Sequence, residues 1–323
     1  MLKTNLPLSP TRPDWVAANR EAAIWQVMLA RFAAKLSGMS TKQNNLIAVA
    51  RLSMKLAAKF MRPYSHEQAP KRYTQPQLMT CLVLKAYLKT TYRGVIEIID
   101  ASDKLRESIG FAGRLPNYST LKYFADRSQV TEIADAMLVE IVKNFAPAEE
   151  EVAIDSTGLE TTSASVHFRA RSGSKRKKFV KLSVCVLVGS LLPAGMVLSW
   201  GPGNDKCEAM ELMGKSAQAI MPKKLFADAG YDADWVHVFS REVWKAESWI
   251  PPVTHRRDGT LGGEYRPLMT EENLKNSGYT KRWKVESFMS GLKRTVGSTL
   301  SARKPTAMMT EAALKVLTYA LRR

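Results

Sequence analysis

Two aspartates stand where a buried strand is expected to stop, a position that suits metal-dependent chemistry. Asp155 follows the apolar run VAI, and Asp228 follows LFA with small Ala229 and Gly230 behind it. A carboxylate at such a position costs desolvation free energy unless backbone hydrogen bonds or a metal ion compensate its charge. Strand ends along one edge of an open α/β sheet are also where ligand sites collect. For either aspartate alone, capping of a turn is the commoner explanation.

A third acid, Glu286, is accompanied by side chains that can bind phosphate. Tyr279, Arg282, Glu286 and Lys293 follow one another at offsets of three, seven and fourteen residues from the tyrosine. In a continuous α-helix, at about 100° per residue, all four lie within roughly 60° of each other. One face of a helix predicted over 279–295 would therefore present a phenol, a guanidinium, a carboxylate and an ammonium. Without the two aspartates, a solvated face with an Arg–Glu pair explains this spacing equally well.

Three segments together resemble a known family. AIDST, FADAGYD and YTKRWKVESFMSGLK are similar to the three catalytic regions of the DDE transposases that bacterial insertion sequences of groups four and five encode. The resemblance covers residues 150–323 and includes the stretch GPGNDKCEAMELM before the second aspartate. It implies metal-dependent cleavage of DNA at transposon ends and transfer of the freed 3′-OH into target DNA. Because only 57 residues separate Asp228 from Glu286, no large β-rich insertion is expected between them.

The resemblance also implies roles for the individual residues. Asp155, Asp228 and Glu286 would be catalytic and would hold two Mg²⁺ ions, for which Mn²⁺ can substitute, with Asp155 bridging both. Carboxylate oxygens suit such ions, and a pair of ions can activate water and stabilise a leaving 3′ oxygen. Phosphates near the cut would be bound by Tyr279, Arg282 and Lys293. The implied partners are double-stranded DNA, as terminal inverted repeats and as target, and a second copy of the chain in a homodimer, because two ends must be joined.

The charge of the chain agrees with a nucleic-acid partner. There are 48 Lys and Arg against 30 Asp and Glu, a formal net charge of +18. Such an excess attracts polyanions, of which nucleic acid is the commonest inside a cell. The densest run, RARSGSKRKKFVK, contains Gly173 at an expected loop tip and predicts a basic hairpin, with a solvated charged loop as the alternative. The residues expected to bind phosphate there are Lys175, Arg176, Lys177 and Lys178.

The tryptophans of the second half divide into two groups. Trp283 falls about 40° from Tyr279 on the predicted helix face, so it is a candidate contact with DNA. Core packing is the expected role of three others: Trp235, Trp244 and Trp249.

The elements that must position these side chains begin at Pro147, where the pattern changes. Val180 and the four apolar residues that follow at period two indicate one face of a strand. The order β-β-β-α-β-α-β predicts a mixed sheet flanked by helices, the element order of the ribonuclease-H-like α/β fold. The expected strands are VAIDSTGLE, 180–188, 191–200, KLFADAG and SWIPPV. Helices are expected at about 205–220, 232–246, 279–295 and 305–322, and Asp232 would cap the second of them. A polar loop is expected at 254–278.

Residues 1–146 form a different, all-helical region, so we divide the chain into domains 1–146 and 147–323. Its helices are expected at 14–36, 41–60, 76–89, 93–101 and 131–145, with a shorter one that Ser119 would cap. Short helices joined by tight turns suit a helix-turn-helix-like DNA-binding unit. A dimerisation or packing role is equally compatible with this pattern.

Other features bound the possible functions. Three cysteines without a close pair and four histidines without ligand spacing support neither a disulfide framework nor a zinc site. The start has no signal-peptide pattern and no apolar run reaches bilayer length, so we expect no membrane contact and a place in the bacterial cytoplasm beside the nucleoid. Two alternatives stay open: a non-catalytic DNA-binding regulator derived from a transposase, and a ribonuclease-H-like nuclease that cuts without strand transfer.

Overall fold

A computed structural model describes residues 45–146, 148–161, 179–254 and 260–323. Residues 45–323 belong to one compact unit. The helix predicted at 14–36 and the basic segment Lys175–Lys178 lie outside the described residues. Within the described part of the chain, no helix is both long and apolar enough to cross a bilayer.

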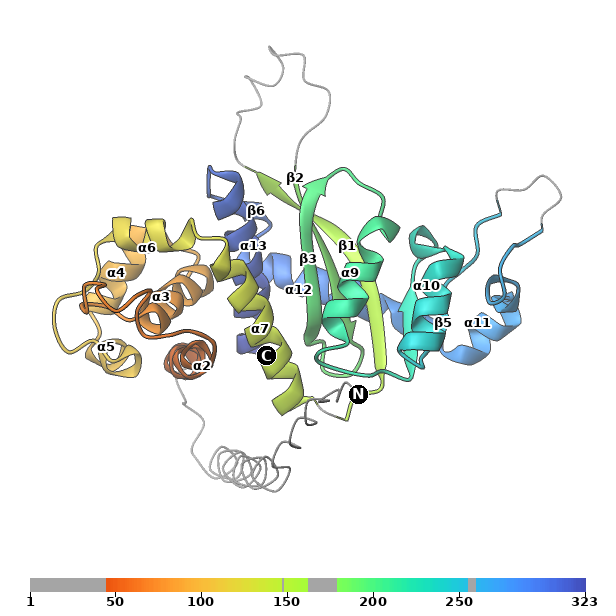
Figure 1. Cartoon of the computed structure of the whole chain (residues 1–323), viewed down its shortest axis with the longest axis horizontal. Coiled ribbons are helices and arrows are strands. Elements are labelled where there is room, and N and C mark those ends of the chain that lie inside the picture. The colour runs from red at the N-terminus through yellow and green to blue at the C-terminus, as the bar shows by residue number, and fades with distance from the viewer. Residues whose placement is uncertain (1–44, 147, 162–178, 255–259) are drawn as a thin grey trace, which may run out of the picture. The chain divides into compact units, whose positions relative to one another are not determined.

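A six-stranded sheet forms the centre of the unit (Figure 1), with the strand order β3-β2-β1-β4-β5. β1, β2 and β3 are antiparallel, whereas β4 pairs parallel with β1 and β5 parallel with β4. A short strand, β6, pairs parallel with the far end of β1. This mixed sheet, with helices on both faces, confirms the predicted ribonuclease-H-like fold. The strands are β1 (Glu151–Thr161), β2 (Phe179–Leu187), β3 (Pro193–Gly201), β4 (Lys224–Ala227), β5 (Glu247–Trp249) and β6 (Thr299–Leu300).

Helices cover both faces of this sheet (Figure 1). α9 (Lys206–Ser216) packs on one face, and α12 (Trp283–Val296) packs on the other. The alternation of side chains along β1 shows the division: Ser156 contacts Asp205 beside α9, whereas Thr157 contacts Lys293 of α12. Because both faces are covered, β2 is buried on both of them, beyond the single face that its period-two pattern predicted.

Among the described residues, the helices that precede the sheet are α2 (Asn45–Phe60), α3 (Gln75–Tyr87), α4 (Tyr92–Asp100), α5 (Asp103–Ile109), α6 (Tyr118–Ala125) and α7 (Gln129–Phe145). Local signals set several of their starts: Thr74 forms a capping box with Gln77 at α3, and Thr91 caps α4. The last helix, α13 (Pro305–Arg322), packs against α3 and α7 as well as against β3. The helical part and the sheet therefore share one continuous core, and the division at residue 146 stays a prediction.

Several expected boundaries were wrong, each for a local reason. The side chain of Asn117, not Ser119, caps α6 by accepting the Ser119 amide. The helix expected over 232–246 is α-helical only as α10 (Asp234–Val238) and continues as a π-helical turn. α5 and α11 (Glu271–Ser277) were not predicted, because seven-residue helices show too few turns of periodicity to stand out in the sequence.

Candidate active site

The two aspartates lie at the same level of neighbouring strands. In the parallel ladder of β1 and β4, Ile154 is paired with Ala227, so Asp155 and Asp228 are the next residues on each side. Parallel neighbours are about 4.8 Å apart across a ladder, which brings the two carboxylates to one edge of the site. The prediction that Asp155 ends its strand was wrong, because β2 continues to pair with β1 as far as Glu160. What stops at this level is β4, and the Asp228 carboxylate then accepts the Gly230 amide in a sharp turn.

Charge repulsion and burial both act on these aspartates. The pKa of Asp155 is raised to about 6, chiefly by burial. The nearby Asp228 and Asp205 carboxylates act in the same direction, whereas the Ser156 amide and Arg282 oppose the rise. Burial is also the main reason why the pKa of Asp228 is raised, with Asp205 adding to it. A site in which two carboxylates disfavour each other's charge is one where a cation is stabilised.

Arg282 supplies a cation from the chain itself. Its guanidinium lies 3.8 Å from Asp155 Oδ2 and 2.5 Å from Glu286 Oε1, so it links the first acid to the third. Glu286 belongs to the first turn of α12, and 55% of its side chain is exposed. The structure therefore joins Glu286 to the aspartate pair through an arginine.

The continuous helix expected over 279–295 was wrong at its start. Gly278, with φ +82°, ends α11, and Tyr279–Arg282 form a 3₁₀ turn before α12 begins at Trp283. The turn is held to the sheet because the Tyr279 hydroxyl donates to the Ala227 carbonyl at 3.0 Å. Tyr279 and Arg282 thus reach the site through a turn, and the geometry of one helix face applies only from Trp283 onward.

Tyr279 and Lys293 frame the aspartates on the α12 side. Burial raises the pKa of Tyr279 to about 12, and Asp228, Asp155 and Glu286 all contribute in the same direction, opposed by Arg282. These groups therefore lie around a single phenol. Lys293 Nζ donates to Thr157 Oγ1 at 2.6 Å, two residues beyond Asp155 on the same face of β1. Tyr279, Arg282 and Lys293 thus lie on the α12 side of β1, the side that Asp155 faces.

A polar network on the opposite face of β1 was not anticipated from the sequence. Lys181 Nζ, in the middle of β2, lies 2.9 Å from Asp205 Oδ1 and 3.1 Å from Glu208 Oε2, and its side chain is 4% exposed. The Ser156 hydroxyl donates to the same Asp205 oxygen. The available signal was Lys181 itself, a lysine inside the apolar strand FVKLSVCVL, which requires buried acidic partners.

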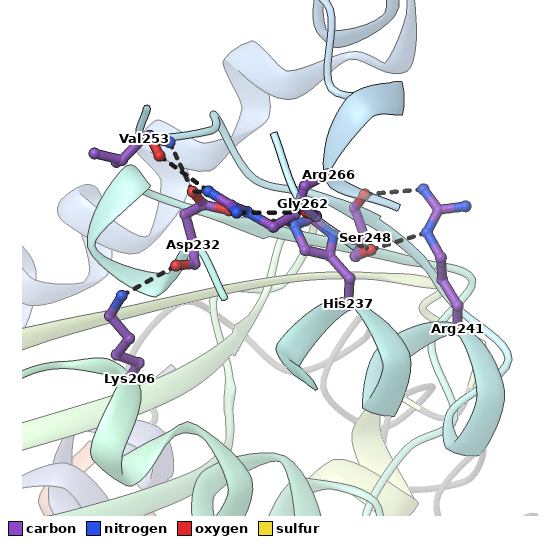
Figure 2. A network of polar contacts seen from close by, with 8 residues as sticks. All are labelled: Lys206, Asp232, His237, Arg241, Ser248, Val253, Gly262 and Arg266. Atoms are coloured by element: carbon purple, nitrogen blue, oxygen red, sulfur yellow. Dashed lines mark hydrogen bonds and ion pairs between the residues drawn. The ribbon is translucent and has the colours of Figure 1, made fainter. Parts of the chain in front are cut away.

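A second network fixes the segment that follows Asp228 (Figure 2). Asp232 accepts two hydrogen bonds from Arg266, at 2.8 and 2.6 Å, and one from the Val253 amide at 2.6 Å. Burial alone would raise the pKa of Asp232, but these hydrogen bonds outweigh it and lower the pKa. Asp232 was predicted to cap α10, but its side chain does not do so. It instead ties the chain around residues 253–266 to the turn beside the site. The neighbouring His237 is buried, and burial lowers its pKa to about 4.

The tryptophans partly follow the prediction. Trp244 is buried in the core, and Trp283 is half exposed at the start of α12. Trp235 was expected in the core but is 38% exposed, because α10 turns it outward.

The carboxylate oxygens of this site suit a hard divalent cation. In the arrangement shown, no three His, Cys, Asp or Glu side chains of the described residues are placed to hold a metal ion together. Glu286 is turned onto Arg282 instead, and its exposed side chain has room to rotate. The carboxylates of Asp155 and Asp228 suit such an ion by their chemistry, whereas the Glu286 carboxylate is bound to Arg282.

A family model described as a transposase DDE domain matches residues 146–321, more than half of the chain. The chain belongs to the DDE transposase family. Transposases of this family generally use divalent metal ions. No curated protein sequence matches the chain. Among solved structures, a piggyBac transposase in a synaptic complex with hairpin DNA aligns with 87% of this chain and 73% of its own, at 12% identity and a TM-score of 0.42. Assignment of this transposase to insertion-sequence groups four or five stays a prediction.

Proposed function

We propose that this transposase cleaves DNA at transposon ends and transfers the freed 3′-OH into target DNA, with Asp155, Asp228 and Glu286 as catalytic residues. The observation that carries this proposal is the pairing of Ile154 with Ala227, after which both aspartates follow at one level. Arg282 then ties Glu286 to Asp155. The family match over the same region supports the same conclusion.

We propose that the three carboxylates hold two Mg²⁺ ions, with Mn²⁺ able to substitute. When bound, the ions activate water and stabilise the leaving 3′ oxygen. Asp155 and Asp228 are held for this by their own backbone contacts, from the Ser156 and Gly230 amides. Glu286 joins them once Arg282 has exchanged its carboxylate partners for a DNA phosphate, which a guanidinium can grip with two hydrogen bonds.

The DNA is proposed to approach from the α12 side. Lys293 lies there beside Thr157, and half-exposed Trp283 stands at the start of the helix. Tyr279 has its hydroxyl on the Ala227 carbonyl, so it also holds the strand end before Asp228 in place. We retain the basic segment Lys175–Lys178 as a further phosphate contact. Synapsis of two ends requires a homodimer, and the enzyme would work on DNA in the bacterial cytoplasm.

The test is cleavage and strand transfer on a DNA fragment that carries the terminal repeats flanking the gene, with MgCl₂ or MnCl₂. Asp155→Asn should lower the cleavage rate about a thousandfold or more, the scale seen when one member of a catalytic set is lost. Asp103→Asn is the control, because this exposed acid lies on α5, in the helical part of the chain. Equal cleavage by Asp155→Asn and the wild type would refute the assignment. Cleavage without joining would indicate a nuclease, and DNA binding without cleavage would indicate a regulator.

A further inference from the structure

Asp205 approaches the aspartate pair from the opposite face of β1. One carboxylate oxygen, Oδ1, is held by the Lys181 ammonium and the Ser156 hydroxyl. The other oxygen faces the site: a Cβ on Gly230 would lie 3.4 Å from Asp205 Oδ2 and 3.0 Å from Asp228 Oδ1. Two carboxylates from different segments therefore border the same small space, which stays open because residue 230 is glycine.

The charges of the network do not cancel. Lys181 is one ammonium against two carboxylates, Asp205 and Glu208. Glu208 is further satisfied by the hydroxyls of Ser183 and Ser199, and its side chain is only 13% exposed. Asp205 is 32% exposed and carries the oxygen that faces Gly230. The excess negative charge of the network therefore lies on the side of Asp228.

The three ammonium hydrogens of Lys181 have three acceptors: Asp205 Oδ1, Glu208 and the Gly203 carbonyl. This accounts for only one of the two oxygens of Asp205. The buried Tyr231 hydroxyl, which makes no hydrogen bond of standard geometry to the described residues, lies in the same region, three residues beyond Asp228. An acid that is fixed at one oxygen and open at the other is oriented for a second partner.

We propose that Asp205 is a positioning residue of the active site, whose fixed negative charge increases the affinity of the aspartate pair for the divalent cation and holds β1 beside Asp155. This rests on the proposed function, because it assumes that Asp155 and Asp228 bind the metal. Ser156 is the link between the two faces: its backbone amide binds Asp155, and its hydroxyl binds Asp205. Removing the charge should weaken the response to metal without weakening DNA binding, since a carboxylate does not attract phosphates.

The experiment compares Asp205→Asn with Glu208→Gln in the full-length protein. Both variants remove one negative charge from the partners of Lys181, but only the first acts at the oxygen that faces Gly230. The unfolding temperature is measured against the concentration of MnCl₂ or MgCl₂ in the absence of DNA, and the metal concentration at half of the full effect is one midpoint. The metal concentration that gives half-maximal cleavage is the second midpoint and is measured separately. We expect Asp205→Asn to raise both midpoints about tenfold, the scale for loss of a unit charge a few ångströms away in a partly exposed site, and Glu208→Gln to raise them less than threefold. Affinity for DNA in EDTA should be unchanged or slightly higher.

The outcomes separate this inference from the proposed function. Asp155→Asn is the reference, and it should abolish the metal response. If it does so while Asp205→Asn behaves like the wild type, or while Glu208→Gln shifts the midpoint as much, the role of Asp205 is refuted and the proposed function stands. A wild-type protein that shows neither a metal response nor cleavage contradicts the proposed function itself, and the inference with it. Should Asp205→Asn fail to fold, Ser156→Ala decides: it keeps every charge but removes one of the two contacts that hold Asp205 Oδ1, and an unchanged midpoint would overturn the positioning role.

Discussion

Replacing Arg282 by alanine should increase the affinity of the site for metal while it decreases affinity for DNA. In the structure the guanidinium neutralises Asp155 and Glu286, two of the carboxylates proposed to bind a divalent cation. On the proposed function, a metal ion competes with Arg282 until DNA phosphates draw the side chain away. The substitution removes that competition and also removes a phosphate contact.

The magnitude follows from the geometry of the two ion pairs. Unit charges about 4 Å apart interact by about 1 kcal/mol in water and about 4 kcal/mol near a protein surface. Arg282 and Asp155 are 3.8 Å apart and both mostly buried, with 24% and 16% of their side chains exposed. Glu286 is more than half exposed, so its pair contributes little. After screening by salt, a gain of about 1–2 kcal/mol is expected, roughly a five- to thirtyfold lower metal midpoint.

The neighbouring lysine provides the control. Lys281 lies in the same 3₁₀ turn and carries the same charge, but its ammonium binds Glu151 at the start of β1, at 2.8 and 2.7 Å. Lys281→Ala and Arg282→Ala are compared by thermal unfolding against MnCl₂ without DNA, and by binding of end DNA in EDTA. An Arg282→Ala variant that binds metal no better than Lys281→Ala would show that only net charge matters. The competition argument would then be wrong.

Two further predictions concern stability. Because burial raises the pKa of Asp155 to about 6, its charged form destabilises the metal-free fold, an effect that is absent below the unfolded pKa near 4 and complete above pH 6. Because the pKa rises from about 4 to about 6, the free energy of unfolding of Asp155→Asn should exceed that of the wild type by about 3 kcal/mol at pH 8, and the difference should vanish near pH 4. A constant difference across this range would count against this reasoning. Arg266→Gln leaves the Asp232 carboxylate, 1% exposed, without its cation and should lower the free energy of unfolding in urea by about 3 kcal/mol at pH 7. This loss of unfolding free energy should shrink as the pH falls toward the lowered pKa of Asp232. A loss below about 1 kcal/mol at pH 7 would show that Arg266 and Asp232 do not form a stabilising buried ion pair.

Local signals were sufficient for the main part of the site. Asp155 and Asp228 were found because each follows a short apolar run, and Glu286 was found because Arg282 and Lys293 accompany it at recognisable offsets. The element order from β1 to α13 could be predicted for the same reason, since the periodicity of a buried strand or helix is a property of neighbouring residues. These patterns do not depend on which strand pairs with which.

Only the tertiary structure decided how the site is completed. The register of Ile154 with Ala227 places the two aspartates at one level, and no residue pattern within either segment specifies a register between segments 73 positions apart. The hydroxyl of Tyr279 and the φ of Gly278 break the expected helix into a turn, which carries Arg282 to Asp155.

Asp205 shows the same limit. In sequence it is one acid at the start of an expected helix, and it comes close to Asp228 only because β1 alternates its faces, sending Ser156 toward α9 while Thr157 faces Lys293. Alternation within a strand can be predicted from sequence, but the segment that meets each face depends on chain folding over long separations. The sequence of this transposase thus identified the residues proposed to carry the chemistry, and the packing of α9 and α12 on opposite faces of one strand decided what surrounds them.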